Sequence, residues 1–156
     1  MKEIERKWIV ETDALPAVVR DGRSCRIEQA YVALEPDGPE VRIRRTDDAM
    51  TLTVKSKGGL VRTEVDVEID AAQFEALMSV AGARRLTKTR YFVDVSGHEA
   101  SVDVYDGTLA GMVIAEVEFA SESAANAFDA PAWFGRDVTD DAQYRNRALV
   151  LMQRDG

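Results

Sequence analysis

The sequence predicts a mainly β fold of the α+β class, formed by one domain over residues 1–156. Most of the chain alternates apolar and polar residues with period two, which is typical of strands with one buried face. Turn formers such as EPDGPE at 35–40 and DDAM at 47–50 separate these segments. With 46% hydrophobic residues among 156, the chain can build one sizeable core. Closure of about eight antiparallel strands into a barrel is a hypothesis at this stage.

The predicted strands follow one another with short interruptions. The first is EIERKWIV, and the Gly-Gly pair at 58 and 59 suits a tight hairpin turn that needs positive φ. The strands are expected at residues 3–10, 25–34, 41–45, 51–57, 60–69, 83–95, 99–107 and 112–120.

Three segments have helical character. Asp70 is placed to cap the first helix, with Gln73 three residues later in capping-box position. The last helix is expected to be capped by Thr139, with Asp140 and Asp141 favouring its positive end. The predicted helices cover residues 70–80, 121–128 and 140–154.

Composition restricts the chemistry. The formal net charge of -8 argues against a broad binding surface for nucleic acid or an anionic membrane. The lack of a signal-like apolar stretch, and of an apolar run near the roughly 20 residues of a spanning helix, predicts a cytoplasmic protein. A single cysteine, Cys25, excludes an internal disulfide framework and a cysteine-based zinc site. The single histidine, His98, is expected in a hairpin turn, so catalysis would depend on carboxylates, lysines and arginines.

Charged residues recur two positions apart on the predicted strands. For any single strand the alternative interpretation is a polar face in water, which usually mixes polar residues loosely. Here some strands are purely basic and others purely acidic. Like charges on one strand face repel each other mildly. Each row of like charges therefore predicts that a group of opposite charge faces it. The pairs are Glu3 with Glu5, Arg42 with Arg44, Lys55 with Lys57, Lys88 with Arg90, and Glu116 with Glu118.

A closed barrel would collect these charges in its lumen, where buried charges must be paired or coordinated. Lysine and arginine donate charge-assisted hydrogen bonds to phosphate oxygens. Carboxylates are hard oxygen ligands that Mg²⁺ or Mn²⁺ accepts. The pattern therefore indicates a phosphorylated anion held together with a divalent metal.

Seven ordered motifs resemble those of the CYTH superfamily, the triphosphate tunnel metalloenzymes. EIERK at 3–7 matches the ExExK signature of that family, and the end of the chain, PAWFGRDVTDDAQYRNRAL, is similar to that of its short bacterial inorganic tripolyphosphatases. The resemblance covers essentially the whole chain and implies an eight-stranded antiparallel tunnel for a linear triphosphate. The other motifs are RIR at 42–44, TVKSK at 53–57, RTEVD at 62–66, KTRY at 88–91, DVYDG at 103–107 and EVEF at 116–119.

The resemblance implies a set of site residues. Asp66 departs from the family, which often has glutamate there, and its shorter side chain would retract the carboxylate; Lys57 would lie at the tunnel rim and Glu68 in solvent. The catalytic residues would be Glu5, Lys7, Arg44 and Lys88. The phosphate contacts would be Lys7, Arg42, Arg44, Lys55, Arg62, Lys88 and Arg90. The ligands of Mg²⁺ or Mn²⁺ would be Glu3, Glu5, Glu64, Asp66, Asp103, Glu116 and Glu118.

The implied reaction is metal-dependent hydrolysis of a triphosphate, with inorganic tripolyphosphate as the favoured small-molecule partner. Class IV adenylate cyclases and thiamine or nucleoside triphosphatases share these motifs and stay open as alternatives. A polyphosphate or nucleotide sensor is a non-enzyme alternative, although a pure anion binder gains nothing from glutamates that face its ligand. A dimerisation scaffold is a third interpretation, and a homodimer is compatible with each of them.

The C-terminal helix bears on the choice of substrate. The resemblance implies that it plugs one tunnel mouth, and QYRNRALVLM at 143–152 carries Arg145 and Arg147. A plugged tunnel would accept tripolyphosphate more easily than a nucleotide with its base. The alternative is a helix that simply packs Leu149, Val150 and Met152 against the barrel.

Overall fold

Within residues 4–36, 38–56 and 63–152, which the computed structural model describes, eight strands form one antiparallel sheet. In chain order the strands are β1 (Ile4–Ile9), β2 (Ser24–Leu34), β3 (Glu40–Thr46), β4 (Ala49–Lys55), β5 (Glu64–Glu68), β6 (Arg85–Val95), β7 (His98–Tyr105) and β8 (Val113–Phe119). Their order across the sheet is β1-β8-β7-β6-β2-β3-β4-β5. The mainly β, antiparallel fold that the alternation predicts is therefore confirmed.

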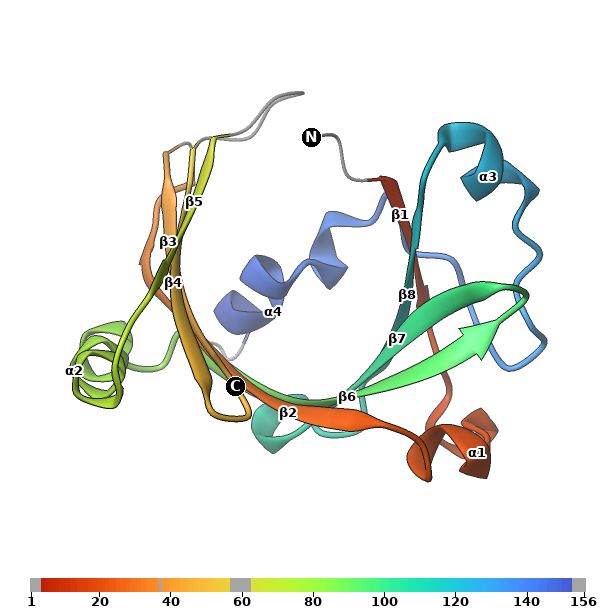
Figure 1. The fold of residues 1–156 in the computed structure, drawn as a ribbon, viewed down its shortest axis with the longest axis horizontal. Helices are drawn as coiled ribbons and strands as arrows, with labels where there is room; N and C mark the ends of the chain where they lie inside the picture. Colours follow the sequence, from red (N-terminus) through yellow and green to blue (C-terminus); the bar gives the residue numbers. More distant parts are fainter. Residues whose placement is uncertain (1–3, 37, 57–62, 153–156) are drawn as a thin grey trace.

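Short helices cover the strongly curved sheet. In the described part of the chain they are α1 (Ala17–Arg20), α2 (Ala71–Ala81), α3 (Glu122–Ala127) and α4 (Asn146–Met152), with the 3₁₀ turns η1 (Thr12–Ala14), η2 (Gly107–Leu109) and η3 (Ala142–Tyr144). Helix α4 lies on the concave side, whereas α1, α2 and α3 lie outside (Figure 1). No helix among these residues is both long and apolar enough to cross a membrane.

The capping signals correctly located the second helix. The carboxylate of Asp70 accepts a hydrogen bond from the backbone N–H of Gln73 at 2.8 Å, and the Gln73 side chain accepts one from the backbone N–H of Asp70 at 2.9 Å. This reciprocal pair satisfies two donors that a helix start otherwise leaves open. The short helix predicted at 121–128 is confirmed as α3.

The single helix predicted at 140–154 is wrong over its described part, and so is its cap. Arg145 adopts an extended conformation (φ -75°, ψ 144°) and separates η3 from α4. Thr139 caps neither element, because its hydroxyl accepts from the backbone N–H of Lys7 at 3.1 Å and donates to Asp137 at 2.5 Å. The carboxylate of Asp141 caps η3 instead, accepting from the backbone N–H of Gln143 at 3.0 Å.

Closure of the sheet into a barrel is not observed, because β1 and β5 are the two edges of the sheet over the described residues. A later segment occupies the outer edge of β1. Backbone N–H groups of Gly135 and Val138 donate to the carbonyls of Ile9 and Lys7, both at 2.8 Å, and Ile9 donates to Arg136 at 2.9 Å. A side-chain carbon at Gly135 would lie 2.4 Å from the Ile9 carbonyl oxygen, so only glycine permits this approach. The backbone groups that β5 would need on this part of β1 are already paired.

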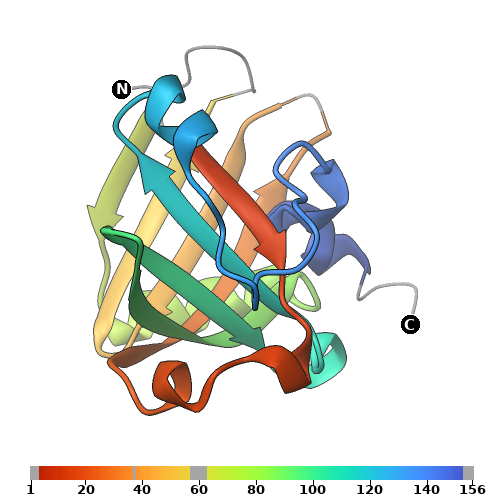
Figure 2. The same cartoon turned by 90° about the vertical axis from the view of Figure 1, so that its right-hand side faces the viewer.

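Three apolar clusters hold the sheet and its helices together. On the convex side, Trp8 packs against Phe128 and Phe134 with ring centroids 5.6 and 4.8 Å apart, and Figure 2 shows α3 and the following segment covering the outside of β1 and β8. Helix α2 buries Phe74 against β2 and β3 in a second cluster. On the concave side, α4 buries Leu149 in a third cluster. Because this third cluster covers part of the concave face, a polar site can lie only on the remaining part of that face.

The β6–β7 hairpin corrects the placement of the single histidine. The turn consists of Ser96 and Gly97, with φ of 50° and 82°. His98 is the next residue and begins β7, where its ring meets Phe119 and Phe128 edge-on. The histidine is thus a packing residue beside the turn. The other predicted hairpin, at Gly58 and Gly59, lies outside the described residues.

Candidate functional site

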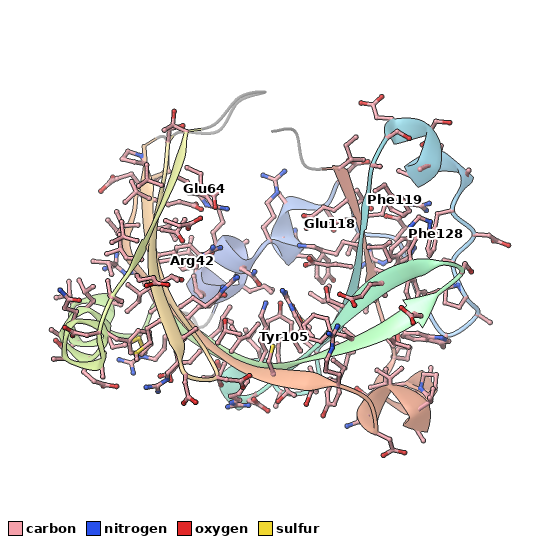
Figure 3. All side chains as sticks on the ribbon, viewed as in Figure 1. Arg42, Glu64, Tyr105, Glu118, Phe119 and Phe128 are labelled. Carbon is pink, nitrogen blue, oxygen red and sulfur yellow. The ribbon has the colours of Figure 1, made fainter. Side chains whose placement is uncertain are left out.

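A charged cavity of about 670 Å³ lies on the concave face of the sheet, next to α4. Figure 3 shows Arg42 and Glu64 on the β3–β5 side of this face and Glu118 on the opposite side. The lining residues are Glu5, Lys7, Tyr31, Glu40, Arg42, Arg44, Lys55, Glu64, Arg90, Glu116, Glu118, Arg145, Asn146 and Arg147.

A larger hollow of about 980 Å³ lies between β1, α3 and residues 137–142. It holds several carboxylates and one cation, Arg6, whose guanidinium already bonds to Asp137 at 2.9 Å. An anionic ligand would be repelled there. The cavity on the concave face is therefore the better candidate site despite its smaller volume.

Strand geometry gathers cations on one wall of the cavity. Because side chains alternate along a strand, Arg42 and Arg44 of β3 share the concave face. Gln29 of β2 is the register partner of Arg44, and its amide oxygen accepts hydrogen bonds from Nε at 3.1 Å and Nη2 at 2.9 Å. Burial, and then the charge of Arg42, lower the pKa of Arg44 to about 10, so it stays a cation at neutral pH.

Two buried donors on this wall lack a partner in the described structure. They are Nε of Arg42 and Nε2 of Gln29. Buried polar groups are normally hydrogen-bonded, and one left unpaired costs about 1–3 kcal/mol. Together with the mutual repulsion of the two arginines, these donors indicate that the wall is built to receive an anion with oxygen acceptors.

Three charged residues cluster at the cavity: Arg90 lines it, and Lys88 and Asp103 are buried beneath it. Asp103 of β7 is 1% exposed and bonds to Lys88 at 2.7 Å and to Arg90 at 2.7 and 2.8 Å. Burial alone would raise the pKa of Asp103, but the charges of Lys88 and Arg90 outweigh it and hold the pKa at about 2. Burial lowers the pKa of Lys88, whose amine also lies 5.3 Å from the ring centre of Tyr105. Both oxygens of Asp103 are therefore engaged by these cations.

Carboxylates line the opposite side. The β1–β8 register makes Glu5 the direct partner of Glu118 and Lys7 the direct partner of Glu116. The amine of Lys7 neutralises Glu116 at 3.3 Å. Like charges directly opposite on adjacent strands destabilise a sheet, so the Glu5–Glu118 pair is suited to a cation between the strands.

The carboxylates present fit a divalent ion that shares its coordination with a ligand. Among the described side chains, no three from His, Cys, Asp and Glu are arranged to hold a metal. Mg²⁺ usually takes one or two carboxylates, keeps several waters and completes its shell with substrate phosphates. The Glu5–Glu118 pair supplies such a carboxylate set, beside a cavity whose cations suit phosphate.

Comparison with known proteins decides the family, because the CYTH domain model matches residues 1–148. The chain belongs to the CYTH family. An inorganic triphosphatase of Nitrosomonas europaea is 41% identical to it over 154 residues, covering 97% of this chain and 98% of the relative. An inorganic triphosphatase of Acetivibrio thermocellus is 34% identical over 151 residues, covering 96% and 93%.

Solved structures agree with the CYTH fold seen here. The crystal structure of an inorganic triphosphatase superposes with a TM-score of 0.79 at 38% identity, covering 97% of this chain and 95% of that one. A protein from Hippeastrum with a dominant triphosphatase activity gives a TM-score of 0.55 at 15% identity over 80% of this chain and 82% of that one. The latter likeness shows the fold alone.

This CYTH domain brings most of the sequence-predicted site residues into the cavity, but not all. Lys88 and Asp103 lie beneath it, bound to each other. Asp66 is exposed on β5 and accepts a hydrogen bond from Thr53 at 2.5 Å, outside the cavity lining. Lys57, Glu3 and Arg62 lie outside the described residues. The predicted residues that do line the cavity are Glu5, Lys7, Arg42, Arg44, Lys55, Glu64, Arg90, Glu116 and Glu118.

Some residues in and around the CYTH cavity were not predicted from the sequence. Tyr31 lines the cavity, whereas Gln29 is buried outside the lining and bonds to Arg44. The two residues share the concave face of β2, so their spacing of two was the available signal, although neither is charged. Asn146 enters the cavity from α4, and no spacing rule connects it to a strand. Charged pairs two positions apart therefore did not indicate these neutral donors.

Proposed function

We propose that this protein hydrolyses inorganic tripolyphosphate to pyrophosphate and phosphate with Mg²⁺ or Mn²⁺. The observation that carries the proposal is the two-sided cavity, in which a wall of cations faces paired glutamates. The inorganic triphosphatases named above support the choice of substrate, since both are similar over nearly the full length of this chain.

The cations would bind and orient the substrate. Arg42 and Arg44 offer planar donor groups that can engage phosphate oxygens in pairs, and Lys55 lies on the neighbouring strand β4. Phosphoryl transfer depends mainly on positioning and on neutralising negative charge. Arg90, kept in place by Asp103, would complete this wall.

The glutamates would hold the metal. Glu5 and Glu118 are the first candidates because they are opposed in register, with Glu116 on the same strand as Glu118 and Glu64 across the cavity on β5. Their existing partners, Lys7 for Glu116 and Lys55 for Glu64 at 3.8 Å, would keep them in place. A divalent ion held there would neutralise phosphate charge and lower the pKa of a water molecule.

The position of α4 favours an inorganic over an organic triphosphate. The helix lies within the concave side, packs Leu149 and Val150 against the sheet, and brings Arg145 and Arg147 to the cavity. Leu149 and Val150 pack as the alternative interpretation of this segment expected, and the same helix would also close off part of the concave face. The space left is polar along its lining and suits a bare phosphate chain better than one bearing a base.

The test is a substrate panel. Phosphate release is measured from tripolyphosphate, ATP, thiamine triphosphate and pyrophosphate with Mg²⁺, Mn²⁺ or EDTA, and cyclic AMP is assayed in the ATP samples. We expect metal-dependent release from tripolyphosphate above all others. Cyclic AMP would identify a cyclase, and preferred release from an organic triphosphate would overturn the substrate assignment. Tight binding of tripolyphosphate without turnover would identify a sensor.

Variants test the assignment of the metal-binding side. Glu5→Gln and Glu118→Gln keep the shape of each side chain and remove its charge, so metal-dependent turnover should fall at least about 100-fold while the thermal unfolding temperature hardly changes. Glu75→Gln makes the same chemical change on α2, outside the cavity, and should leave the rate as in wild type. Wild-type rates for both cavity variants would remove this pair from the site.

A further inference from the structure

The segment at α4 contributes a neutral donor to the cavity. Asn146 lies among the lining residues between Arg145 and Arg147. Its amide oxygen accepts a hydrogen bond of 2.9 Å from the hydroxyl of Tyr105, a residue 41 positions earlier at the end of β7. This hydrogen bond from β7 therefore fixes the orientation of the Asn146 side-chain amide.

The hydroxyl of Tyr105 is the donor of this hydrogen bond, and the amide oxygen of Asn146 is the acceptor. This arrangement leaves the NH₂ group of Asn146 turned away from Tyr105. The amide NH₂ group carries two further donors, and no residue in the described part of the chain accepts from them.

The backbone around Asn146 is fastened on several sides. The amine of Lys7 on β1 donates to the carbonyl of Tyr144 at 3.2 Å. Arg147 donates to the carboxylate of Glu40 at 3.5 Å and to the carbonyl of Glu35 at 3.2 Å. These contacts tie the segment to both walls of the cavity, so the amide donors have a set position.

We propose that Asn146, oriented by Tyr105, donates its amide N–H groups to a phosphate oxygen of the bound triphosphate and so positions the substrate. The inference rests on the proposed function and adds a residue outside the charged rows. A neutral amide suits this position, because it can bind an oxyanion without adding repulsion to the arginines on either side. Tyr105 acts only through Asn146 and is a positioning residue.

The decisive comparison is between Asn146→Asp and wild type. Aspartate keeps the size of the side chain and can still accept from Tyr105, but it offers the phosphate an acceptor and a negative charge in place of donors. A hydrogen bond to a charged group accounts for about a 10- to 100-fold change in affinity, so the Kd for tripolyphosphate should rise by at least that factor. Asn126→Asp makes the same change on α3 outside the cavity and should leave the Kd unchanged.

A double-mutant cycle separates positioning from simple packing. Tyr105→Phe keeps the ring near Lys88 but frees the amide, so a rise in Kd of a few-fold is expected, about 3- to 10-fold. Asn146→Ala should raise the Kd about 10-fold or more, and the double variant should be no weaker than Asn146→Ala alone. Additive effects in the double variant would refute orientation by Tyr105.

Binding is measured by isothermal titration calorimetry with tripolyphosphate in EDTA, and KM and kcat are measured with metal. The KM should rise more than kcat falls, and the thermal unfolding temperature of each variant reports its folding. A Kd for Asn146→Asp and Asn146→Ala within two-fold of wild type would overturn the inference. If the wild-type protein binds tripolyphosphate but does not hydrolyse it, the proposed function fails while the binding series still decides the role of Asn146.

Discussion

Replacing Asp103 by asparagine should destabilise the fold strongly, because Asp103 is the one anion of a buried three-charge cluster in the described structure. Lys88 is fully buried and Arg90 largely so, and both depend on this carboxylate. Asparagine keeps the shape of aspartate but removes its charge. Two cations would then lie side by side in the interior without an anion bonded to them.

The magnitude follows from two independent estimates. Removing one partner of a buried ion pair costs about 3–5 kcal/mol. The drop in the pKa of Asp103 from 3.8 to about 2 corresponds to about 2 kcal/mol, at about 1.4 kcal/mol for each tenfold change in acidity. We therefore expect Asp103→Asn to lower the free energy of unfolding by about 3 kcal/mol at pH 7. This loss lowers the midpoint of urea unfolding by about 1.5 M for a domain whose free energy of unfolding falls by about 2 kcal/mol per M urea.

The stabilisation that Asp103 provides should depend on pH in one direction. The folded-state pKa of Asp103 lies below its unfolded value, so the carboxylate stabilises the fold fully above pH 4 or so. This contribution is lost as the pH falls from about 4 to about 2. The difference between wild type and Asp103→Asn, measured by urea unfolding at several pH values, should therefore shrink over that window.

An exposed ion pair provides the matched control. Glu99 bonds to Arg23 at the same distance of 2.7 Å, but their side chains are 57% and 67% exposed. Glu99→Gln should cost at most about 1 kcal/mol, since water already screens the pair. If Asp103→Asn costs no more than Glu99→Gln, or its cost does not change between pH 5 and pH 2, the buried cluster does not stabilise the fold as argued.

Three further variants test how the C-terminal half is attached. Arg6→Ala removes the guanidinium that donates to the Ala125 carbonyl at 2.9 Å and to the carboxylate of Asp137. This change should lower the free energy of unfolding, measured by urea titration, by about 1–3 kcal/mol. An unchanged free energy of unfolding would mean that these hydrogen bonds do not stabilise the fold. Gly135→Ala pushes a methyl group into the Ile9 carbonyl and should lower the free energy of unfolding by about 1–3 kcal/mol, which lowers the thermal unfolding temperature. An unchanged melting curve would contradict the close approach. Leu149→Ala empties a fully buried position under α4 and should cost about 2–5 kcal/mol by chemical denaturation, with a cost below about 1 kcal/mol arguing against the packing of this helix.

The period-two pattern predicted the sheet and most of the cavity lining. Arg42 and Arg44 had to share a face wherever β3 lay, because successive side chains of a strand point to opposite sides. The same rule placed Glu116 with Glu118. The capping box at Asp70 was also readable, since both of its hydrogen bonds join residues three positions apart.

The bonding partners of Asp103 could not be predicted from the sequence of its strand. The alternating pattern placed Asp103 on the charged face of the strand, and the family resemblance implied that it is a metal ligand. In the folded protein its two oxygens bond to Lys88 and Arg90, which approach it from the neighbouring strand β6. Which opposite charge lies within bonding distance depends on register and depth, and the sequence of one strand contains neither.

The sequence by itself determined the local elements: which residues form strands, which face each side chain takes and where α2 begins. Covalent geometry and hydrogen bonds between near neighbours set these features, and a short window of sequence contains them. The tertiary structure alone decided that the sheet stays open and that Asn146 reaches the cavity. Both outcomes depend on segments far apart in the chain: Gly135 and Val138 occupy the edge of β1 that closure would need, and Tyr105 holds Asn146 in place. No local pattern records which of several distant segments will pair with a free strand edge, because that competition is settled only when the chain packs.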